Sequence, residues 1–335
     1  MPLISARSQV LNIYSRAARQ GWVLPVFNSE NLTTTEAILA SALAYSKKTG
    51  IEGLPVIVGI TSKYQPRPQA VYYSHTRQWD IGMQLFLQEL EVLTSAKSPY
   101  AGLKVMVHLD HIQWDDDKEL LEWDMGRFSS IMYDASALPL EMNMEKTAQF
   151  VRQNAHKILI EGACDVIGPA SGEAGGLTSP DDAYHYMNRT GVDIIVANLG
   201  TEHRAAAAEL RYQSHLAQQI TARLGKGCLC LHGASSVPVK SLGRLFEDGI
   251  RKVNIWTALE RESSVVLMEE MLKNIAKVIG PKKTSELKLA GLLGETTDDS
   301  PNASVDYCTT TYRQGLVFET MKKLVTTYLD VFYKL

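Results

Sequence analysis

Short apolar runs alternate with longer amphipathic stretches along the whole chain. The runs are rich in Val, Ile and Leu without regular polar alternation, which is typical of strands buried on both faces of a parallel sheet. The pattern predicts eight strands, which span Val23 to Phe27, Leu54 to Ile60, Leu103 to Leu109, Ser130 to Tyr133, Lys157 to Glu161, Val192 to Asn198, Cys228 to Leu231 and Ile250 to Ile255.

The stretches between these strands repeat their apolar residues at helical spacing and predict helices. They span Thr33 to Lys48, Met83 to Ser95, Asp115 to Glu122, Asn143 to Asn154, Asp181 to Arg189, Tyr212 to Leu224, Lys240 to Phe246 and Ala258 to Ile279. Eight strands, each followed by a helix or a helical insertion, favour a closed barrel over an open doubly wound sheet. The predicted fold class is therefore α/β, a (β/α)8 TIM barrel.

Two regions exceed a minimal barrel. An insertion after the second strand, at about residues 62–82, is rich in proline and aromatic residues. Residues 294–306 are rich in Gly, Pro, Asp and Ser and predict a mobile loop, which a helix near residues 313–335 follows. We therefore expect the barrel over residues 1–290, and a mobile loop with a C-terminal helical extension over residues 291–335.

The amino-terminal segment has two interpretations. Residues 1–29 carry Arg7, Arg16 and Arg19 before any acid, which is a feature of transit peptides. However, Val10 and Tyr14 repeat at helical spacing and Gly21 provides a stop signal, which favours an integral first helix. No apolar run approaches the roughly 18 residues that span a bilayer. The sequence thus predicts a cytoplasmic protein without a membrane partner.

Composition excludes several function classes. Hydrophobic residues make up 45% and charged residues 21% of the chain, which is ordinary globular usage. The formal net charge is -3 and no basic tract stands out, so we expect no nucleic-acid partner. The 4 cysteines lack paired spacing, which argues against a zinc ribbon or a disulfide framework.

The strand ends carry the candidate chemistry, because residues at the carboxyl ends of barrel strands form the active site. The third strand leads to Asp110 and His111, the sixth to His203 and the seventh to His232. Three imidazoles with one open position hold a catalytic zinc, and an adjacent aspartate can move a proton on a bound substrate. A lone strand-end histidine is more often structural, and Asp110 could instead cap the following turn.

Three further residues near these strand ends have competing interpretations. His108 lies on the same face as Asp110 and is either a supporting or a core residue. Cys228 and Cys230 share a face with His232. They could be soft metal ligands, but packing in the barrel interior is the favoured interpretation.

From about Gln9 to Met271 the chain resembles the class II, zinc-dependent fructose-bisphosphate and tagatose-bisphosphate aldolases. The motifs that carry the resemblance are Pro25-Val26-Phe27-Asn28, His108-Leu109-Asp110-His111, Met132-Tyr133-Asp134-Ala135-Ser136, Leu177-Thr178-Ser179-Pro180-Asp181, Gly200-Thr201-Glu202-His203, His232-Gly233-Ala234-Ser235 and Gly249-Ile250-Arg251-Lys252-Val253-Asn254. Each motif is weak alone, but together their order and spacing form a specific signature.

The resemblance implies a role for each matching position. His111, His203 and His232 match the zinc ligands, and Asp110 matches the catalytic acid/base. Asn254 matches a residue that hydrogen-bonds the ketose oxygens, and Gly233, Ser235 and Thr257 match the phosphate-binding loops. Asn28 and Thr61 fall where family members line the second half of the substrate. Glu173 is either the mobile-loop base that takes the ketose α-proton or a solvated loop charge.

The implied reaction is reversible aldol cleavage of a ketose phosphate or a related ketol. One zinc per chain polarises the carbonyl and stabilises an enediolate, and Asp110 takes the proton of the C4 hydroxyl. The implied protein is a homodimer or homotetramer, a lyase of carbohydrate metabolism.

The chain also departs from the family pattern. Glu161-Gly162-Ala163 replaces Glu-Ala-Glu, and Trp256 stands where the family commonly has aspartate. Arg204 replaces a glycine that helps to hold phosphate and a monovalent cation, so that cation is an open expectation here. Arg204 could itself clamp a phosphate, sulfonate or carboxylate. The leading hypothesis is an aldolase; a non-catalytic binding barrel and, less favoured, a metal-dependent hydrolase remain as alternatives.

Overall fold

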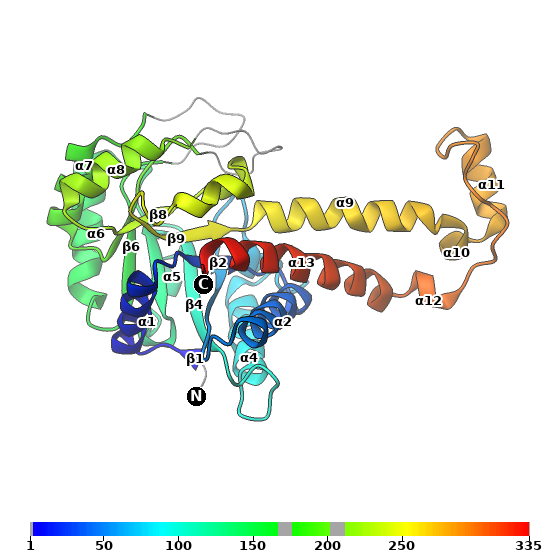
Figure 1. Ribbon diagram of the computed structural model, residues 1–335, viewed down its shortest axis with the longest axis horizontal. Helices are drawn as coiled ribbons and strands as arrows, with labels where there is room; N and C mark the ends of the chain where they lie inside the picture. Colours follow the sequence, from blue (N-terminus) through cyan, green and yellow to red (C-terminus); the bar gives the residue numbers. More distant parts are fainter. Residues whose placement is uncertain (1–2, 167–175, 202–211, 335) are drawn as a thin grey trace.

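The computed structural model describes residues 3–166, 176–201 and 212–334. Strands β2 to β9 pair in parallel, and the β2–β9 and β4–β5 pairings close them into a barrel (Figure 1). The strands are β2 Leu24–Asn28, β3 Pro55–Thr61, β4 Lys104–Gln113, β5 Ser130–Asp134, β6 Leu159–Ala163, β7 Ile194–Val196, β8 Leu229–Leu231 and β9 Ile250–Ile255. The predicted TIM barrel is therefore confirmed.

The barrel has the predicted number of strands, but some of them differ in length from the prediction. β7 is limited to Ile194–Val196, whereas β4 continues to Gln113 through a bulge. A short strand, β1 Leu3–Ile4, was not predicted. It pairs with the first half of β4, ahead of the segment that pairs with β5. Two residues are too few to show a hydrophobic period, so only the tertiary pairing reveals this strand.

The helices that surround the barrel begin and end at ordinary signals. The Asn31 side chain caps α2 by accepting from the amide of Thr34 at 3.2 Å, and Ser179 caps α7 in the same way. Left-handed Gly21 ends α1, as predicted. The helices are α1 Arg7–Gln20, α2 Leu32–Thr49, α3 Gln69–Tyr72, α4 Trp79–Leu93, α5 Lys118–Leu121, α6 Leu140–Asn154, α7 Pro180–Thr190 and α8 Ser214–Leu224.

Some predicted helices had the wrong extent. The one expected from Met83 already begins at Trp79, inside the insertion. The one expected at Asp115 to Glu122 is the single turn α5. The segment predicted as a helix at Lys240 to Phe246 is a 3-10 helix, Val239–Arg244, which follows Pro238. Apolar spacing over so few residues does not distinguish these two helix types.

The first helix closes the amino-terminal end of the barrel. Arg7 donates to the carbonyl of Ile158 at 2.9 Å and pairs with Asp193 at 2.6 Å, at the starts of β6 and β7. The hydroxyl of Tyr14 on the same helix is buried. Because this end of the barrel is covered, the carboxyl ends of the strands are the accessible side.

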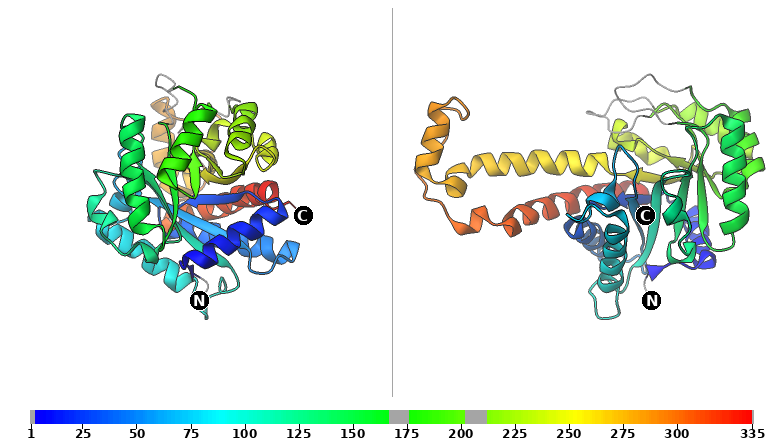
Figure 2. Two further views of the ribbon diagram at one scale, coloured as in Figure 1. Left: turned by 90° about the vertical axis from the view of Figure 1, so that its left-hand side faces the viewer. Right: turned by 180° about the vertical axis from the view of Figure 1, so that it is seen from behind.

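A helical arm, residues 257–320, extends from the barrel in both figures of the whole molecule (Figures 1 and 2). It consists of α9 Thr257–Lys273, α10 Ile275–Ile279, α11 Pro281–Leu289, α12 Val305–Cys308 and the first half of α13 Thr310–Phe332. The second half of α13 packs on α2 and buries Met321, Val325 and Leu329. The predicted long helix after β9 breaks at Asn274, whose side chain bonds the Glu270 carbonyl.

The boundary expected at residue 290 directly follows α11, which lies toward the far end of this arm (Figure 1). Within the described residues, every helix is either too short or too polar to cross a membrane.

Candidate active site and metal centre

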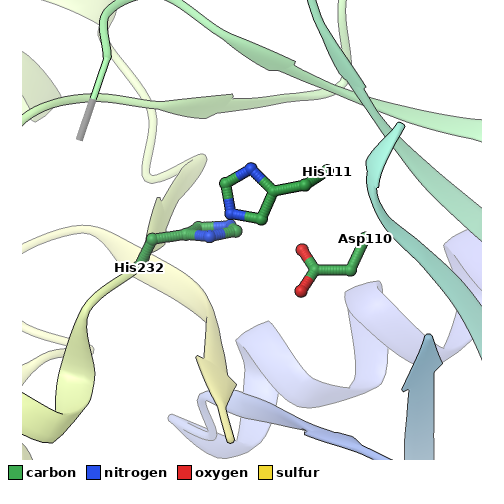
Figure 3. A group of neighbouring side chains, drawn as sticks. All are labelled: Asp110, His111 and His232. Atoms are coloured by element: carbon green, nitrogen blue, oxygen red, sulfur yellow. The ribbon is translucent and has the colours of Figure 1, made fainter. Parts of the chain in front are cut away.

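A bulge in β4 brings two consecutive side chains, Asp110 and His111, to the same side of the strand (Figure 3). In a regular strand, neighbouring side chains point to opposite faces. Here the register with β5 shifts between Leu109 and Ile112, and His111 has a left-handed φ of 49°. Such a backbone conformation is costly for a residue with a Cβ and is concentrated at functional sites. One strand end thus delivers a carboxylate and an imidazole to one point.

His232, which follows β8, completes this group. Its ring meets that of His111 edge to face, with the centroids 5.0 Å apart. The potential ligand atoms of Asp110, His111 and His232 all lie within 4.8 Å of one another, and the three residues are buried. Two imidazoles and a carboxylate at this spacing are a suitable donor set for a divalent transition metal.

Each imidazole is oriented by a second carboxylate. His111 donates through Nδ1 to Asp134 Oδ2 at 3.0 Å, and His232 donates through Nε2 to Glu161 Oε1 at 3.0 Å. Metal-ligating histidines characteristically donate their other ring N–H in this way. Burial lowers the pKa of His232 although Glu161 opposes it, which favours the neutral ring that a metal requires.

Asp110 lies at the centre of a hydrogen-bond network. Its Oδ1 accepts from Asn254 Nδ2 at 2.8 Å, while its Oδ2 accepts from Asn28 Nδ2 at 2.9 Å and from Arg67 Nη2 at 2.6 Å. Burial alone would raise the pKa of Asp110, but His111, Arg67 and His232 hold it well below its ordinary value. The carboxylate is therefore ionised and able to accept a proton.

A buried lysine lies beneath the group. The Nζ of Lys252 forms an ion pair with Glu161 Oε2 at 2.7 Å, donates to Asn254 Oδ1 at 2.6 Å and contacts His108 Nε2 at 3.2 Å. Because Lys252 occupies the Asn254 oxygen, the Asn254 amide nitrogen faces Asp110. Burial and the Lys252 charge lower the pKa of His108 to about 3, so this histidine is a neutral part of the interior.

A cleft of about 510 Å³, open to solvent, lies against this group. The residues that line it come from the ends of β4, β8 and β9 and from the insertion between β3 and α4. They include Tyr64, Arg67, Asp110, His232, Gly233, Ser235, Asn254, Trp256 and Thr257. Gly233 has a left-handed φ of 69°, and Thr257 begins α9. Backbone amides at such a turn and helix start are suited to binding an anion.

The structure brings most of the predicted site residues together. Asp110, His232, Gly233, Ser235, Asn254 and Thr257 line the cleft; His111 and Asn28 contact this set from within the barrel. Thr61 is buried beside it, where its hydroxyl accepts from the Gln69 amide at 3.1 Å and so holds the insertion. Glu173, His203 and Arg204 lie outside the described residues.

The sequence alone did not predict four side chains that contact the candidate site. They are Arg67 and Gln69, which contact Asp110 and Asn28, and Asp134 and Glu161, which accept from the two histidines. Arg67 and Gln69 belong to an insertion without hydrophobic period, so nothing in the pattern directs them to the site. Asp134 ends β5 and Glu161 lies in β6. An acid at or near a strand end is a usable sequence signal for a carboxylate that orients a metal-binding histidine.

A sequence model of class II fructose-bisphosphate aldolases matches residues 8–333, almost the entire chain. The chain belongs to this family. The predicted resemblance is thus confirmed, and so is the prediction of an enzyme, a lyase of the class II aldolase type.

Individual relatives agree with this assignment. A fructose-bisphosphate aldolase of Staphylococcus epidermidis is 27% identical over 290 residues, which cover 84% of this chain and 91% of that protein. One from Streptococcus pyogenes is 29% identical, over 77% of this chain and 80% of its own length.

Solved structures share the fold. The fructose-bisphosphate aldolase of Campylobacter jejuni superposes with a TM-score of 0.72 at 20% identity, covering 98% of this chain and 94% of its own. An aldolase of Escherichia coli superposes with a TM-score of 0.64 at 18% identity, covering 95% and 94%.

Proposed function

We propose that this aldolase is zinc-dependent and catalyses reversible aldol cleavage of a ketose phosphate or a closely related ketol. The observation that supports this most directly is the position of Asp110. An ionised carboxylate lies within 4.8 Å of the potential ligand atoms of the two imidazoles, in the wall of an open cleft. A general base beside a metal is the arrangement that metal-assisted proton transfer requires.

The donor set fits zinc, with one ion per chain. His111 and His232 would hold it through the ring nitrogens opposite their carboxylate contacts, and His203 is proposed as the third ligand. When bound, such an ion supplies polarisation of the substrate carbonyl.

The protein's own groups would perform the remaining steps. Asp110 takes the C4 hydroxyl proton; the C4–O electrons form the aldehyde carbonyl, the C3–C4 bond breaks and its electron pair stays on the donor half. A proton then returns to C3, for which Glu173 is the proposed donor and, in reverse, the base. Asn254 binds the ketose oxygens, with its amide held in orientation by Lys252.

Substrate anions would bind around the rim of the cleft. Ser235, Thr257 and the backbone at Gly233 are proposed to hold the phosphate of the donor half, in keeping with the phosphate sites of barrels near strands seven and eight. Asn28 is proposed to contact the second half of the substrate, and Thr61 to support it through the insertion. Arg204 is proposed to clamp a phosphate, sulfonate or carboxylate of the substrate.

We infer in addition that the protein is a homo-oligomer. α9 exposes Val265, Val266, Met268 and Leu272, which are 49%, 40%, 59% and 48% exposed, on an arm that extends from the barrel. A row of apolar side chains away from the core is the usual mark of an interface. The family resemblance implies that a second copy of this chain covers this surface of α9.

The alternatives are less well supported. A non-catalytic barrel has no need of an ionised Asp110 beside oriented imidazoles, and a barrel hydrolase usually has a His-x-His pair at the end of its first strand. β2 ends in Asn28 without such a pair.

The first test is zinc content together with cleavage of a panel of ketose phosphates before and after chelation. We expect about one zinc per chain, with activity lost to EDTA and restored by zinc. Asp110→Asn should retain zinc while kcat falls by roughly 10²- to 10⁴-fold. Asp115→Asn, at an exposed position near the end of β4, is the matched control. Stoichiometric zinc without cleavage of any ketose, or no zinc, would contradict the proposal.

A further inference from the structure

The guanidinium of Arg67 reaches the active site from the insertion between β3 and α4. Its Nη2 donates to Asp110 Oδ2 at 2.6 Å, and its side chain is only 11% exposed. Its Cζ lies 4.7 Å from the centroid of the Trp256 ring. Trp256 is in turn fixed, because its indole N–H donates to Glu30 Oε1 at 2.5 Å. The guanidinium is therefore held in place by the Asp110 carboxylate and by the face of the Trp256 ring.

Most of the hydrogen-bonding capacity of Arg67 remains available to a ligand. A guanidinium carries five N–H donors, and in the described part of the chain only Asp110 accepts from this one. Arg67 lines the cleft. Lys252, which also lies close to Asp110, is fully buried and paired with Glu161. Among the described residues, Arg67 is thus the oriented and accessible cation that an entering anionic group meets.

The two oxygens of Asp110 separate the halves of the site. Oδ1 faces Asn254, which the proposed function assigns to the donor oxygens, whereas Oδ2 faces Arg67 and Asn28. Ser235 and Thr257, the proposed phosphate contacts, belong to the loops after β8 and β9 rather than to the insertion. Arg67 therefore lies on the acceptor side of the proton-transfer group.

We propose that Arg67 selects acceptor aldehydes that carry a carboxylate next to the carbonyl carbon. This inference rests on the proposed aldolase function and names the substrate class of the same site. Asp110 exchanges its proton with the oxygen on C4, and Arg67 directly contacts Asp110. A carboxylate bonded to C4 is therefore close enough to reach the remaining N–H groups of Arg67.

The chemistry of the guanidinium favours a carboxylate at that place. Its planar fork matches a carboxylate with two parallel hydrogen bonds, and the stacked Trp256 ring keeps that plane fixed. The phosphate ester at the far end of a three-carbon aldehyde lies several bonds farther from C4. In the condensation, the base of the proposed function takes the proton from donor C3, and the electron pair left on C3 forms the new bond to the aldehyde carbon. The C=O electron pair moves to the aldehyde oxygen, which takes a proton from the protonated form of Asp110, and the acceptor's carboxylate remains unchanged.

The test compares three acceptors with dihydroxyacetone phosphate as the common donor and the zinc-loaded full chain as enzyme. They are glyoxylate, its neutral counterpart glycolaldehyde, and glyceraldehyde 3-phosphate. We expect kcat/KM for glyoxylate to exceed that for glycolaldehyde by roughly 30- to 100-fold, the ratio that one charge-assisted pair supplies. In Arg67→Gln this ratio should fall close to 1, with Arg67→Lys intermediate.

Arg77→Gln is the matched control, because Arg77 is an exposed arginine of the same insertion that stacks on Tyr72. It should keep the wild-type ratio. A wild-type preference for glycolaldehyde or for glyceraldehyde 3-phosphate overturns the inference, as does a ratio that Arg67→Gln leaves unchanged.

A binding measurement separates this inference from the proposed function. If no acceptor is turned over, the aldolase proposal fails, and calorimetric titration of the full chain with glycolate still decides the role of Arg67. Binding that is weakened at least tenfold in Arg67→Gln but kept in Arg77→Gln supports carboxylate recognition. Equal binding by all three proteins overturns it.

Discussion

The buried charge of Lys252 orients several other side chains of this site. Its side chain and that of Glu161 are both 0% exposed, with Nζ and Oε2 2.7 Å apart. The same ammonium orients the Asn254 amide toward Asp110, and Glu161 orients His232. A single ion pair thus fixes both a proposed substrate contact and a proposed metal ligand.

Replacing Lys252 by Met should lower the free energy of unfolding by about 3–5 kcal/mol, because the Glu161 carboxylate would remain buried without its partner. The measurement is urea denaturation of the metal-free protein. The double variant with Glu161→Gln should recover part of the loss. Lys48→Met, which removes a half-exposed pair with Asp330, is the control and should cost less than about 1 kcal/mol. If Lys252→Met lowered the free energy of unfolding as little as Lys48→Met does, Lys252 would not be the charge that compensates Glu161.

Glu260, in the first turn of α9, is a half-buried acid that forms no salt bridge with any cation of the described residues. Burial and then the negative charge of Glu30 raise its pKa from 4.5 to about 7, and its Oε1 is buried without a hydrogen-bond partner in the described part of the chain. The folded state thus prefers the protonated acid. The free energy of unfolding therefore falls as the pH rises from 4.5, the ordinary pKa of a glutamate, to about 7, its pKa in the folded protein, and is constant above that.

Glu260→Gln should therefore stabilise the protein at pH 8, by on the order of 2 kcal/mol, and have little effect near pH 4.5. Thermal melts of both proteins across this range measure the difference. Glu262→Gln, at an exposed acid of the same helix that pairs with Arg261, is the control for the substitution itself. A constant difference between wild type and Glu260→Gln at all pH values would contradict the assignment.

At the scale of elements, the contact between α3 and α4 positions the insertion. A Cβ added to Gly82 in α4 would lie 1.9 Å from the carbonyl oxygen of Ala70 in α3. Only glycine allows this close approach. Because α3 begins at Gln69, which binds Glu30 and the β3 end, the packing also fixes the segment that carries Arg67.

Gly82→Ala should push α3 away from α4, lower the free energy of unfolding by about 1–3 kcal/mol and reduce kcat/KM. Chemical denaturation and steady-state kinetics measure the two effects. Gly315→Ala is the control, since no atom lies within 4 Å of its added Cβ, and as a helical glycine it should become slightly more stable. Unchanged kinetics in Gly82→Ala would mean that α3 does not position the site.

At the scale of the whole molecule, the two long helices α9 and α13 differ in how their apolar side chains are covered. Its apolar side chains on α9 are exposed, whereas the second half of α13 buries Met321, Val325 and Leu329 against the barrel. The fold therefore does not depend on the α9 surface, which is available for association.

Met268→Glu combined with Leu272→Glu should convert the oligomer to monomers without unfolding it, because the new charges would be buried unpaired at the interface. Light scattering coupled to size exclusion measures the mass, and circular dichroism checks the fold. The paired change Lys322→Glu and Lys323→Glu, on α13, is a control for added charge. A wild-type protein that is already monomeric would contradict the inference.

The sequence by itself determined the alternation of strands and helices, and hence the barrel, because burial on both faces imposes an apolar pattern on each strand. It also determined which residues reach the rim: strand order and direction place Asp110, His111 and His232 at the same end. Cap signals such as Asn31 and Gly21 fixed helix ends because they act through local hydrogen bonds and backbone conformation.

Only the tertiary structure decided the geometry of the site. The bulge that turns His111 beside Asp110 depends on pairing with β5, and the approach of Arg67 depends on how α3 packs on α4. The break at Asn274 and the arm likewise have no local signal strong enough to predict them. Contacts between residues far apart in the chain create these features, so their energies do not appear in any short stretch of sequence.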